Sequence, residues 1–373
     1  MKVNSVYIHI PFCLRKCNYC DFVSFPADDC RQRLSKYSGL LQKELELYQN
    51  KICLDSMHTI YFGGGTPSLM EPSQIAGLIS LFPPAEEVTL EANPETLDEE
   101  RLAAFRQAGI NRLSMGVQSF DEKLLQSMGR GHSPAQAIEM VAAARKAGFD
   151  NISIDLIYGL PGQTADGWRQ DLEQALALET EHISLYGLTI EPGTPWGSMV
   201  NKGKLAPVDE DLAADMLEIA MDRLEQAGFN HYEISNFARP GYESRHNLAY
   251  WRRENYLGLG VAAAGCLLEH RLYNYKDYED YEQAVSEGRL PLMDEEILHI
   301  DQVIGEAIFL GLRLSEGIDF AAFQTQYGLD PRRRFRRAIG KMSAAGLLQV
   351  DNEGMRLTKR GVLLGNQVFE QFV

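Results

Sequence analysis

Short apolar runs alternate with amphipathic helical segments along the first half of the chain. Successive runs lie roughly 30 residues apart, a spacing typical of parallel strands joined by crossover helices. The expected strands are residues 5–10, 59–62, 87–91, 112–117, 151–157 and 182–188. Helical patterns between them cover residues 33–49, 72–82, 97–108, 134–147 and 167–178. This alternation predicts an α/β fold built on a parallel sheet.

Polar side chains gather at the carboxyl ends of these expected strands. Asn93 follows the third strand, Gln118 follows the fourth, and Asp155 lies in the fifth. A β/α barrel places functional residues at this edge, whereas a doubly wound open sheet gathers them at one switch point. Because six units and no single switch point are visible, we expect a partial (β/α)6 barrel.

The remainder of the chain has a different pattern. A long helix is expected at residues 209–227, followed by an aromatic-rich segment. Further helices and two short strand-like runs, 346–350 and 355–357, indicate a mainly helical, winged-helix-like module at the C-terminal end. We therefore expect the barrel at residues 1–230, a connecting segment at 231–295 and the C-terminal module at 296–373.

Composition excludes several classes of function. The 373 residues include 52 acidic and 36 basic side chains, a formal net charge of −16, which repels nucleic-acid phosphates. The arginine-rich run at residues 332–337 is the only support for nucleic-acid binding, and such a run is usually a solvated helix start. The longest stretch without a charged side chain, residues 56–70, is shorter than the about 20 residues of a membrane span. With no signal peptide visible, we expect a cytoplasmic protein.

Three of the six cysteines, Cys13, Cys17 and Cys20, lie within eight residues after the first expected strand. Soft thiolates at this density select zinc or an iron–sulfur cluster. No fourth cysteine or histidine stands nearby in the pattern that closes a structural zinc site. The alternatives are three buried, unliganded cysteines or a loose zinc knuckle.

The Cys-x3-Cys-x2-Cys motif after a first strand resembles that of the radical S-adenosylmethionine (SAM) superfamily. The resemblance implies that Cys13, Cys17 and Cys20 hold a [4Fe–4S] cluster and leave one iron open for SAM. It also implies that the glycine loop at residues 63–67 pairs with the SAM amino group. The positions that match SAM contacts of the family are Tyr7, Tyr19, Gly64, Gly65, Thr66, Glu91, Gln118, Arg130 and Asp155.

The residue types at these positions suit SAM on chemical grounds. Carboxylates such as Glu91 can accept hydrogen bonds from ribose hydroxyls, and Arg130 can pair with a carboxylate. Glycines allow the backbone to approach a ligand closely, and the loop lacks the Gly-Lys-Ser/Thr ending of a phosphate loop. The alternative for the glycine loop is a tight turn before a helix, and for Tyr19 it is packing beside the cysteines.

Residues 7–13, 114–120 and 159–164 together resemble one branch of the superfamily. That branch contains the oxygen-independent coproporphyrinogen III oxidases and the HemW-type haem chaperones. The oxidases carry a fourth cysteine where this chain has Phe22, and a long extension before the first strand, where only six residues precede Tyr7. Residues 246–251 match the His-Asn-x-x-Tyr-Trp signature of the chaperones. The resemblance therefore favours the chaperone type.

Haem is the cargo that this resemblance implies. Histidine is a common axial ligand of haem iron, and tyrosine and tryptophan offer flat faces to a porphyrin. His246, Tyr250 and Trp251 are our candidate haem contacts, although histidines and aromatic pairs are more often structural. One departure stands out, because Ala264 occupies a position where relatives commonly have histidine.

The leading hypothesis is a haem chaperone that binds haem, a [4Fe–4S] cluster and SAM, and delivers haem to respiratory haem proteins. A homodimer and peripheral membrane contact through a partner are compatible with it, and cleavage of SAM is left open. The alternative is a radical coproporphyrinogen III oxidase that decarboxylates propionate side chains in porphyrin biosynthesis.

Overall fold

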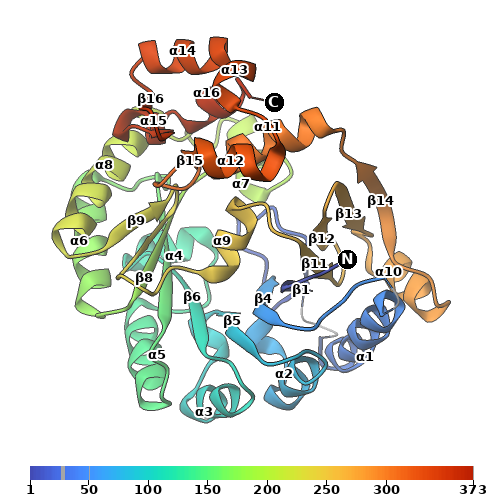
Figure 1. Ribbon diagram of the computed structural model, residues 1–373. Coiled ribbons are helices and arrows are strands. Elements are labelled where there is room, and N and C mark those ends of the chain that lie inside the picture. Colours follow the sequence, from blue (N-terminus) through green and yellow to red (C-terminus); the bar gives the residue numbers. More distant parts are fainter. Residues whose placement is uncertain (27–29, 50, 373) are drawn as a thin grey trace.

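Six parallel strands form the centre of a twelve-stranded sheet in the computed structural model, which describes residues 1–26, 30–49 and 51–372. They follow one another in chain order across the sheet, and each pairs in parallel with the next. Figure 1 shows them as a curved sheet with helices outside. The expected partial (β/α)6 barrel is confirmed. The strands are β1 (Ser5–Ile10), β4 (Met57–Gly64), β5 (Ala85–Ala92), β6 (Arg112–Gln118), β7 (Ile152–Tyr158) and β8 (His182–Gly187).

Helices between these strands cover the outer face of the sheet (Figure 1). They are α1 (Cys30–Tyr48), α2 (Pro72–Ile79), α3 (Glu99–Gln107), α4 (Glu122–Met128), α5 (Pro134–Lys146) and α6 (Ala165–Ala177), with α7 (Pro195–Asn201) and α8 (Glu210–Gln226) after β8. Several of these helices are capped at their N-termini by a side chain. Asp98, Ser133 and Thr164 each accept a hydrogen bond from a backbone N–H of the first turn. The two short 3-10 helices are η2 (Pro67–Leu69) and η3 (Pro94–Thr96).

Alternate residues of the strands point to opposite faces of the sheet. Buried apolar residues such as Ile8, Phe62 and Leu113 pack in one core with the helices. The other positions carry polar side chains, including Tyr61 and Glu91, which hydrogen-bond each other inside the barrel. The barrel therefore has an apolar outer layer and a polar interior.

Antiparallel strands extend the sheet at both edges. One edge adds β10 (Asn236–Ala238) and β9 (Asn230–Glu233) beside β8. The other adds β11 (Tyr256–Leu259), β12 (Ala264–Leu267), β13 (His270–Asn274) and β14 (Leu292–Ile297) beside β1. The expected connecting segment thus contributes these strands, together with α9 (Arg245–Trp251) and α10 (Tyr278–Ser286). A separate two-stranded pair, β2 (Phe12–Cys13) and β3 (Phe25–Pro26), flanks the cysteine loop.

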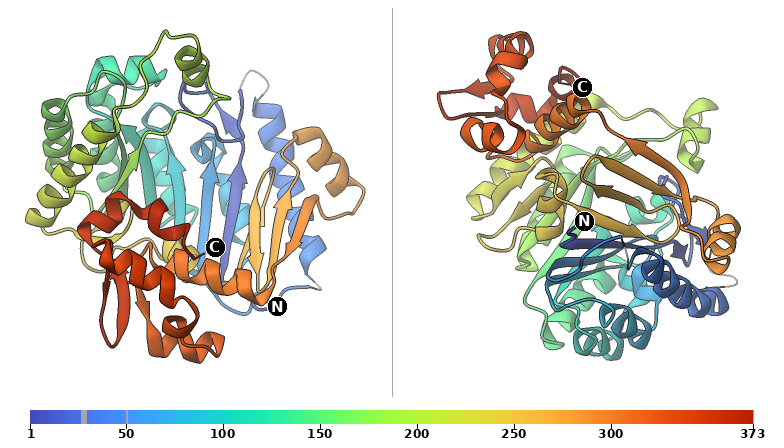
Figure 2. Two further views of the ribbon diagram at one scale, coloured as in Figure 1. Left: turned by 90° about the horizontal axis from the view of Figure 1, so that it is seen from above. Right: turned by 45° about the vertical axis from the view of Figure 1, so that its right-hand side comes forward.

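The C-terminal module has its own hydrophobic cluster, which includes Ile308, Phe323 and Phe369. Figure 2 shows it as a distinct group of helices beside the sheet. The expected mainly helical module with a small hairpin is confirmed. Its elements are α11 (Ile300–Gly311), β15 (Ile318–Asp319), α12 (Phe320–Tyr327), α13 (Pro331–Arg334), α14 (Arg336–Ala344), β16 (Leu348–Val350), β17 (Gly354–Leu357), α15 (Lys359–Leu363) and α16 (Gly365–Phe369). Across the described ranges, no helix is long and apolar enough to cross a membrane.

Candidate functional site

The three motif cysteines lie on one loop at the carboxyl ends of the barrel strands. Cys13 ends β2, and Cys17 and Cys20 follow in the loop, all half-exposed. Asn18 fixes this loop, because its backbone N–H donates to the Met128 carbonyl at 2.9 Å and its carbonyl accepts from Trp196 at 2.9 Å. The thiols are therefore held in place by the ends of α4 and α7.

A chain of hydrogen bonds connects two of the cysteine sulfurs. The Thr66 hydroxyl donates to Cys13 Sγ at 3.6 Å, and Arg130 Nη1 donates to Cys17 Sγ at 3.6 Å. Asn93 joins the two donors, since its Oδ1 accepts from Arg130 Nη2 at 2.7 Å and its Nδ2 donates to Thr66 Oγ1 at 3.2 Å. Hydrogen bonds to sulfur stabilise negative charge on ligating thiolates.

This donor set fits an iron–sulfur cluster. Burial raises the pKa of the Cys13 and Cys20 thiols, which disfavours their thiolate forms. A positively charged iron centre would favour the thiolates when it binds. Arg130 places a cation beside Cys17, which suits the anionic charge of such a cluster. In the described part of the chain, no three His, Cys, Asp or Glu side chains are grouped to hold a single metal ion.

The glycine loop after β4 presses against β1 and the cysteine loop. A Cβ on Gly63 would lie 2.8 Å from the Tyr7 ring, and a Cβ on Gly65 would lie 2.7 Å from the Phe12 carbonyl oxygen. Gly64 has a φ of 113° and would place a Cβ 2.6 Å from the His9 ring. Both the conformation and the close approach therefore require glycine here.

Two carboxylates face the barrel interior beside this loop. Glu91 accepts from Tyr61 Oη at 2.8 Å and from the Gly64 backbone N–H at 3.0 Å. Burial raises the pKa of Glu91 to about 7, and the nearby negative charge of Asp155 adds to the shift. Asp155 accepts from the Ser114 hydroxyl at 3.2 Å, and its pKa is also raised by burial.

The remaining predicted SAM residues surround the same strand ends. Gln118 has a φ of 69° at an irregularity in β6, and a Cβ on Gly116 would lie 2.9 Å from its Nε2. A strained backbone that aims a side chain inward is typical of functional sites. Tyr7 hydrogen-bonds His9 Nδ1 at 2.9 Å, and Tyr19 packs on Trp196 at 6.0 Å.

The structure brings Gly64, Glu91, Thr66, Arg130 and Gln118 together beside the cysteines. Asn93 completes this group, although the sequence motifs assign it no role. Its only signal in the sequence is its position directly after the third strand. Its two partners, Thr66 and Arg130, lie 27 and 37 residues away in the chain.

His246, Tyr250 and Trp251 lie on α9, at the opposite ends of the strands from the cysteines. The Thr59 hydroxyl bonds His246 Nδ1 at 2.7 Å, and the Tyr250 hydroxyl bonds Nε2 at 2.9 Å. The His246 ring is buried and stacks on Tyr61 at 4.8 Å. Trp251 instead faces the C-terminal module, where Arg313 lies 4.6 Å from its ring. Because both His246 nitrogens are hydrogen-bonded, ligation of iron by this ring requires one of these hydrogen bonds to break.

Comparison with known proteins identifies two families along the chain. Residues 7–175 match the radical SAM superfamily, and residues 298–364 match the HemN C-terminal domain. The heme chaperone HemW of Lactococcus lactis is 38% identical, and the alignment covers 100% of this chain and 98% of the relative. The heme chaperone HemW of Bacillus subtilis is 36% identical, with 100% and 99% covered.

One solved structure resembles the fold along nearly the whole chain. The coproporphyrinogen III oxidase HemN from Escherichia coli superposes with a TM-score of 0.85, covering 99% of this chain and 90% of that one. Sequence identity in this match is 24%, so the likeness concerns the fold alone.

Proposed function

This chain belongs to the HemW family of the radical SAM superfamily, and from that premise we propose that it is a haem chaperone that binds haem and delivers it to haem-requiring respiratory proteins. The observation that carries the proposal is the similarity to two proteins named as heme chaperones over the entire length of each chain. The proposal includes a cytoplasmic location.

Membership of the superfamily implies a [4Fe–4S] cluster and SAM as cofactors. We propose that Cys13, Cys17 and Cys20 hold the cluster, supported by the hydrogen bonds from Thr66 and Arg130 to two of the sulfurs. Together the two groups supply one-electron chemistry when they are bound.

The residues around the glycine loop have complementary tasks in SAM binding. In our proposal the backbone of Gly64, Gly65 and Thr66 meets the SAM amino group, and Glu91 and Asp155 accept its hydroxyl donors. Gln118 and Arg130 orient the polar end of the ligand, and Tyr7 and Tyr19 pack beside it. The glycine loop supports this arrangement because it packs tightly against β1 and β2 and is held beside Glu91, which accepts from the Gly64 N–H at 3.0 Å.

Coproporphyrinogen III oxidase activity is the second candidate, and the fold shared with the Escherichia coli enzyme is what favours it. The fourth cysteine expected of such oxidases is replaced by Phe22, whose side chain is 68% exposed beside the cysteine loop. The site therefore lacks a thiol that the oxidases carry, which supports the chaperone.

Anaerobic reconstitution with iron and sulfide tests both candidates. The cluster-loaded chain receives haem in one sample, and coproporphyrinogen III with SAM in another. We expect a haem absorption band, transfer of that haem to an apo haem protein, and no decarboxylation of the porphyrinogen. Loss of two carboxylates from the porphyrinogen would contradict the chaperone proposal.

Two variants complete the test. Cys17→Ala should abolish the visible absorption of the cluster, whereas Cys53→Ala, at a cysteine far from the motif in sequence, should retain it. Mass measurement with and without the cluster then tests whether a homodimer forms. A cluster that assembles unchanged in Cys17→Ala would contradict the assignment of the three ligands.

A further inference from the structure

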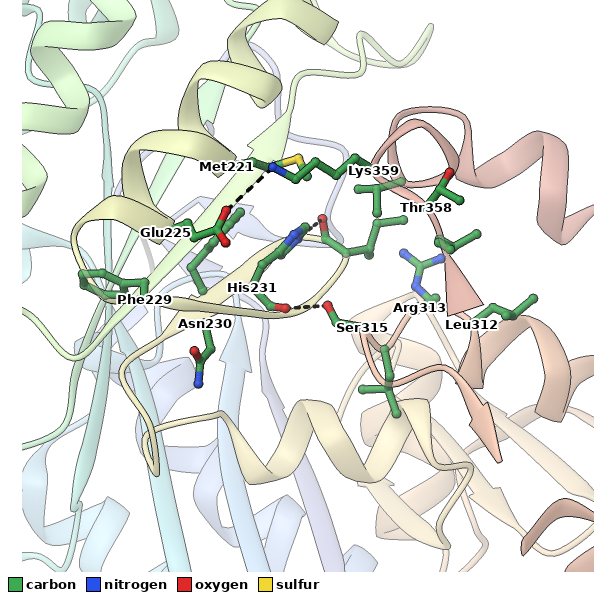
Figure 3. Close-up of a pocket in the computed structure, with 15 residues that line it drawn as sticks. Met221, Glu225, Phe229, Asn230, His231, Leu312, Arg313, Ser315, Thr358 and Lys359 are labelled. Carbon is green, nitrogen blue, oxygen red and sulfur yellow. Dashed lines mark hydrogen bonds and ion pairs between the residues drawn. The ribbon is translucent and has the colours of Figure 1, made fainter. Parts of the chain in front are cut away.

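The charged groups in the pocket between β9 and the C-terminal module have partners within the protein (Figure 3). Lys359 pairs with Glu225 at 3.7 Å, and His231 hydrogen-bonds a backbone carbonyl. The negative charge of Glu233 lies close enough to act on Arg313. These groups therefore need no ligand to balance them. The buried histidine that follows Arg130 near the cysteine loop is in a different position, because its two partners determine its charge.

This histidine, His132, hydrogen-bonds two groups that can only accept. Its Nε2 lies 3.1 Å from the Val117 carbonyl oxygen, and its Nδ1 lies 3.2 Å from Glu95 Oε2. A carbonyl and an ionised carboxylate have no hydrogen to donate, so the ring must donate from both nitrogens. The side chain is 0% exposed, so water does not replace either acceptor. A ring with two N–H donors is an imidazolium, which carries a positive charge.

Three other buried histidines of the barrel are arranged differently. His182 and His246 each hydrogen-bond two hydroxyl groups, and His9 hydrogen-bonds one. Because a hydroxyl can donate or accept, a neutral ring satisfies these contacts. Burial lowers the pKa of all three histidines, which favours the neutral form. The acceptors on both sides of His132 set it apart from them.

The carboxylate that bonds His132 also faces Arg130. Burial acts to raise the pKa of the Glu95 carboxyl, but the hydrogen bond with His132 and the charge of Arg130 outweigh burial, so the pKa is lowered. Glu95 is therefore ionised at neutral pH. Its side chain packs on the backbone between the two cations, where a Cβ on Gly131 would lie 3.1 Å from Glu95 Oε1. One anion is thus shared between a histidine and an arginine.

The charge of Arg130 is what the cofactor site uses. Its Nη1 donates to Cys17 Sγ at 3.6 Å, and its buried Nε has no hydrogen-bond partner among the described residues. A carboxylate facing Arg130 alone would neutralise this charge and compete for its N–H donors. With His132 as the counter-ion of Glu95, the three side chains together remain cationic.

We propose that His132 and Glu95 form a charged positioning pair that leaves the Arg130 guanidinium free for the cofactors. The imidazolium neutralises Glu95, and Arg130 then serves Cys17 and the polar end of SAM. The inference rests on the proposed cluster and SAM sites and adds two residues to which the sequence motifs assign no role. The pair also anchors the chain, because the Arg130 N–H donates to the Leu125 carbonyl at 3.0 Å on one side and His132 is fixed on the other.

Nitrogen-15 nuclear magnetic resonance of the full chain without the cluster tests the charge of His132. We expect both ring nitrogens to be protonated at neutral pH, with their signals assigned by their loss in His132→Gln. In Glu95→Gln the new amide can donate to Nδ1, so a neutral ring satisfies its partners and one nitrogen should lose its proton. A neutral His132 in the unaltered chain would overturn the inference.

Calorimetric titration of SAM into the cluster-loaded chain tests what the pair does for Arg130. In His132→Gln, Glu95 loses its counter-charge and turns to Arg130, so SAM affinity should fall about tenfold. The double variant His132→Gln/Glu95→Gln also removes the competing charge, and its affinity should return to within about twofold of that of the unaltered chain. A merely structural His132 would leave the double variant at least as weak as the single one.

Matched controls remove the same groups from the surface. Glu99→Gln changes a carboxylate of α3 that is 71% exposed, and His58→Gln changes an exposed histidine of β4. Both should leave SAM affinity unchanged. Circular dichroism melting checks that each variant is folded. If His132→Gln does not fold, the charge of His132 in the unaltered chain and in Glu95→Gln still decides the inference.

The outcomes separate this inference from the proposed function. A double variant as weak as His132→Gln overturns the positioning pair and leaves the cofactor proposal standing. Equal SAM affinity in His132→Gln and in the unaltered chain does the same. If the unaltered chain assembles no cluster or binds no SAM, the cofactor proposal is overturned and the positioning role is overturned with it.

Discussion

Asn93 holds together the two donors that reach different cysteine sulfurs. Its side chain accepts from Arg130 and donates to Thr66, so both donors are fixed relative to one another. Arg130 also donates to the Gly116 carbonyl at 2.6 Å, which leaves it little freedom to turn away from Cys17. The Asn93 side-chain amide thus positions the hydrogen-bond donors of both Cys13 and Cys17.

Asn93→Ala should destabilise the cluster without unfolding the chain. Removal of a charge-assisted hydrogen bond costs about 1.5–3 kcal/mol, or roughly tenfold or more in an equilibrium. We expect the half-life of the cluster under an iron chelator to fall about tenfold. Decay of visible absorbance measures it. Asn201→Ala, at an exposed position at the end of α7, is the control. Equal half-lives for the two variants would contradict the role of Asn93.

In our proposal Glu91 accepts hydrogen bonds from SAM, so SAM binding should depend on pH. Its pKa is raised to about 7, first by burial and then by Asp155, so lowering the pH protonates it near neutrality. The protonated carboxyl loses part of its capacity to accept hydrogen bonds. SAM affinity should therefore fall about tenfold between about pH 8 and about pH 6, as expected for one titrating group.

Calorimetric titration of SAM into the cluster-loaded chain at both pH values measures this change. Glu91→Gln cannot titrate, so it should bind SAM more weakly at high pH and lose less affinity on acidification. Asp155 retains its own raised pKa, which leaves a smaller pH dependence in the variant. A full tenfold change in Glu91→Gln would show that another group titrates.

At the level of elements, the glycine loop and β2 are packed too closely for any side chain at Gly65. A Cβ there would lie 2.7 Å from the Phe12 oxygen and 3.0 Å from Cys13 Sγ. Gly65→Ala should destabilise the fold by about 1–3 kcal/mol and reduce the iron bound per chain. Gly77→Ala, inside α2 with nothing within 4 Å, should instead stabilise by about 0.5–1 kcal/mol. Urea unfolding and iron analysis measure both effects, and a stable, iron-replete Gly65→Ala would contradict the packing argument.

The helix α9 closes the end of the barrel that lies away from the cysteines. Burial lowers the pKa of His246 to about 3, so the native state binds fewer protons than the unfolded chain between pH 6.5 and 3. Stability contributed by neutral His246 is thus complete above its ordinary pKa and is lost as pH falls through this window. By pH 5 the loss reaches about 2 kcal/mol.

His246→Gln should remove that share of the acid sensitivity. We expect the variant to be about 1–2 kcal/mol less stable than the parent at neutral pH, because a hydrogen bond and the stack on Tyr61 are lost. The difference between the two proteins should shrink toward pH 5. Urea unfolding at both pH values measures it, and a constant difference would contradict burial of a neutral His246.

Local patterns predict the parts of this fold that depend on neighbours in sequence. The six parallel strands and the helices between them follow from long periodic segments, and the cysteine and glycine loops follow from short motifs. The strands β9 to β13 are three to five residues long, too short for a periodic signal. Asn93 acquires its partners, Thr66 and Arg130, through contacts between separate elements, which no local motif records.

Across the whole molecule, Glu306 joins the C-terminal module to the barrel sheet. It lies on α11 and forms ion pairs with Arg253 at 2.6 Å and with Arg271 of β13. The three side chains are 17%, 8% and 13% exposed. The module and the barrel have separate hydrophobic clusters, so this triad is a main polar link between two cores.

Glu306→Gln should loosen the module before it affects the barrel. Two largely buried arginines would then share one neutral amide, and breaking such a link costs about 2–3 kcal/mol. Hydrogen exchange in α11 and α12 should accelerate about thirtyfold while β4 and β5 remain protected.

Glu316→Gln is the matched comparison, since Glu316 pairs with Arg252 on the same side of the junction but both side chains are about half exposed or more. An exposed pair contributes about 0–1 kcal/mol, so exchange in α11 should change little. Equal acceleration in the two variants would mean that net charge, and not the buried triad, controls docking of the module. Acceleration in Glu306→Gln alone would show that the buried triad holds the module on the barrel.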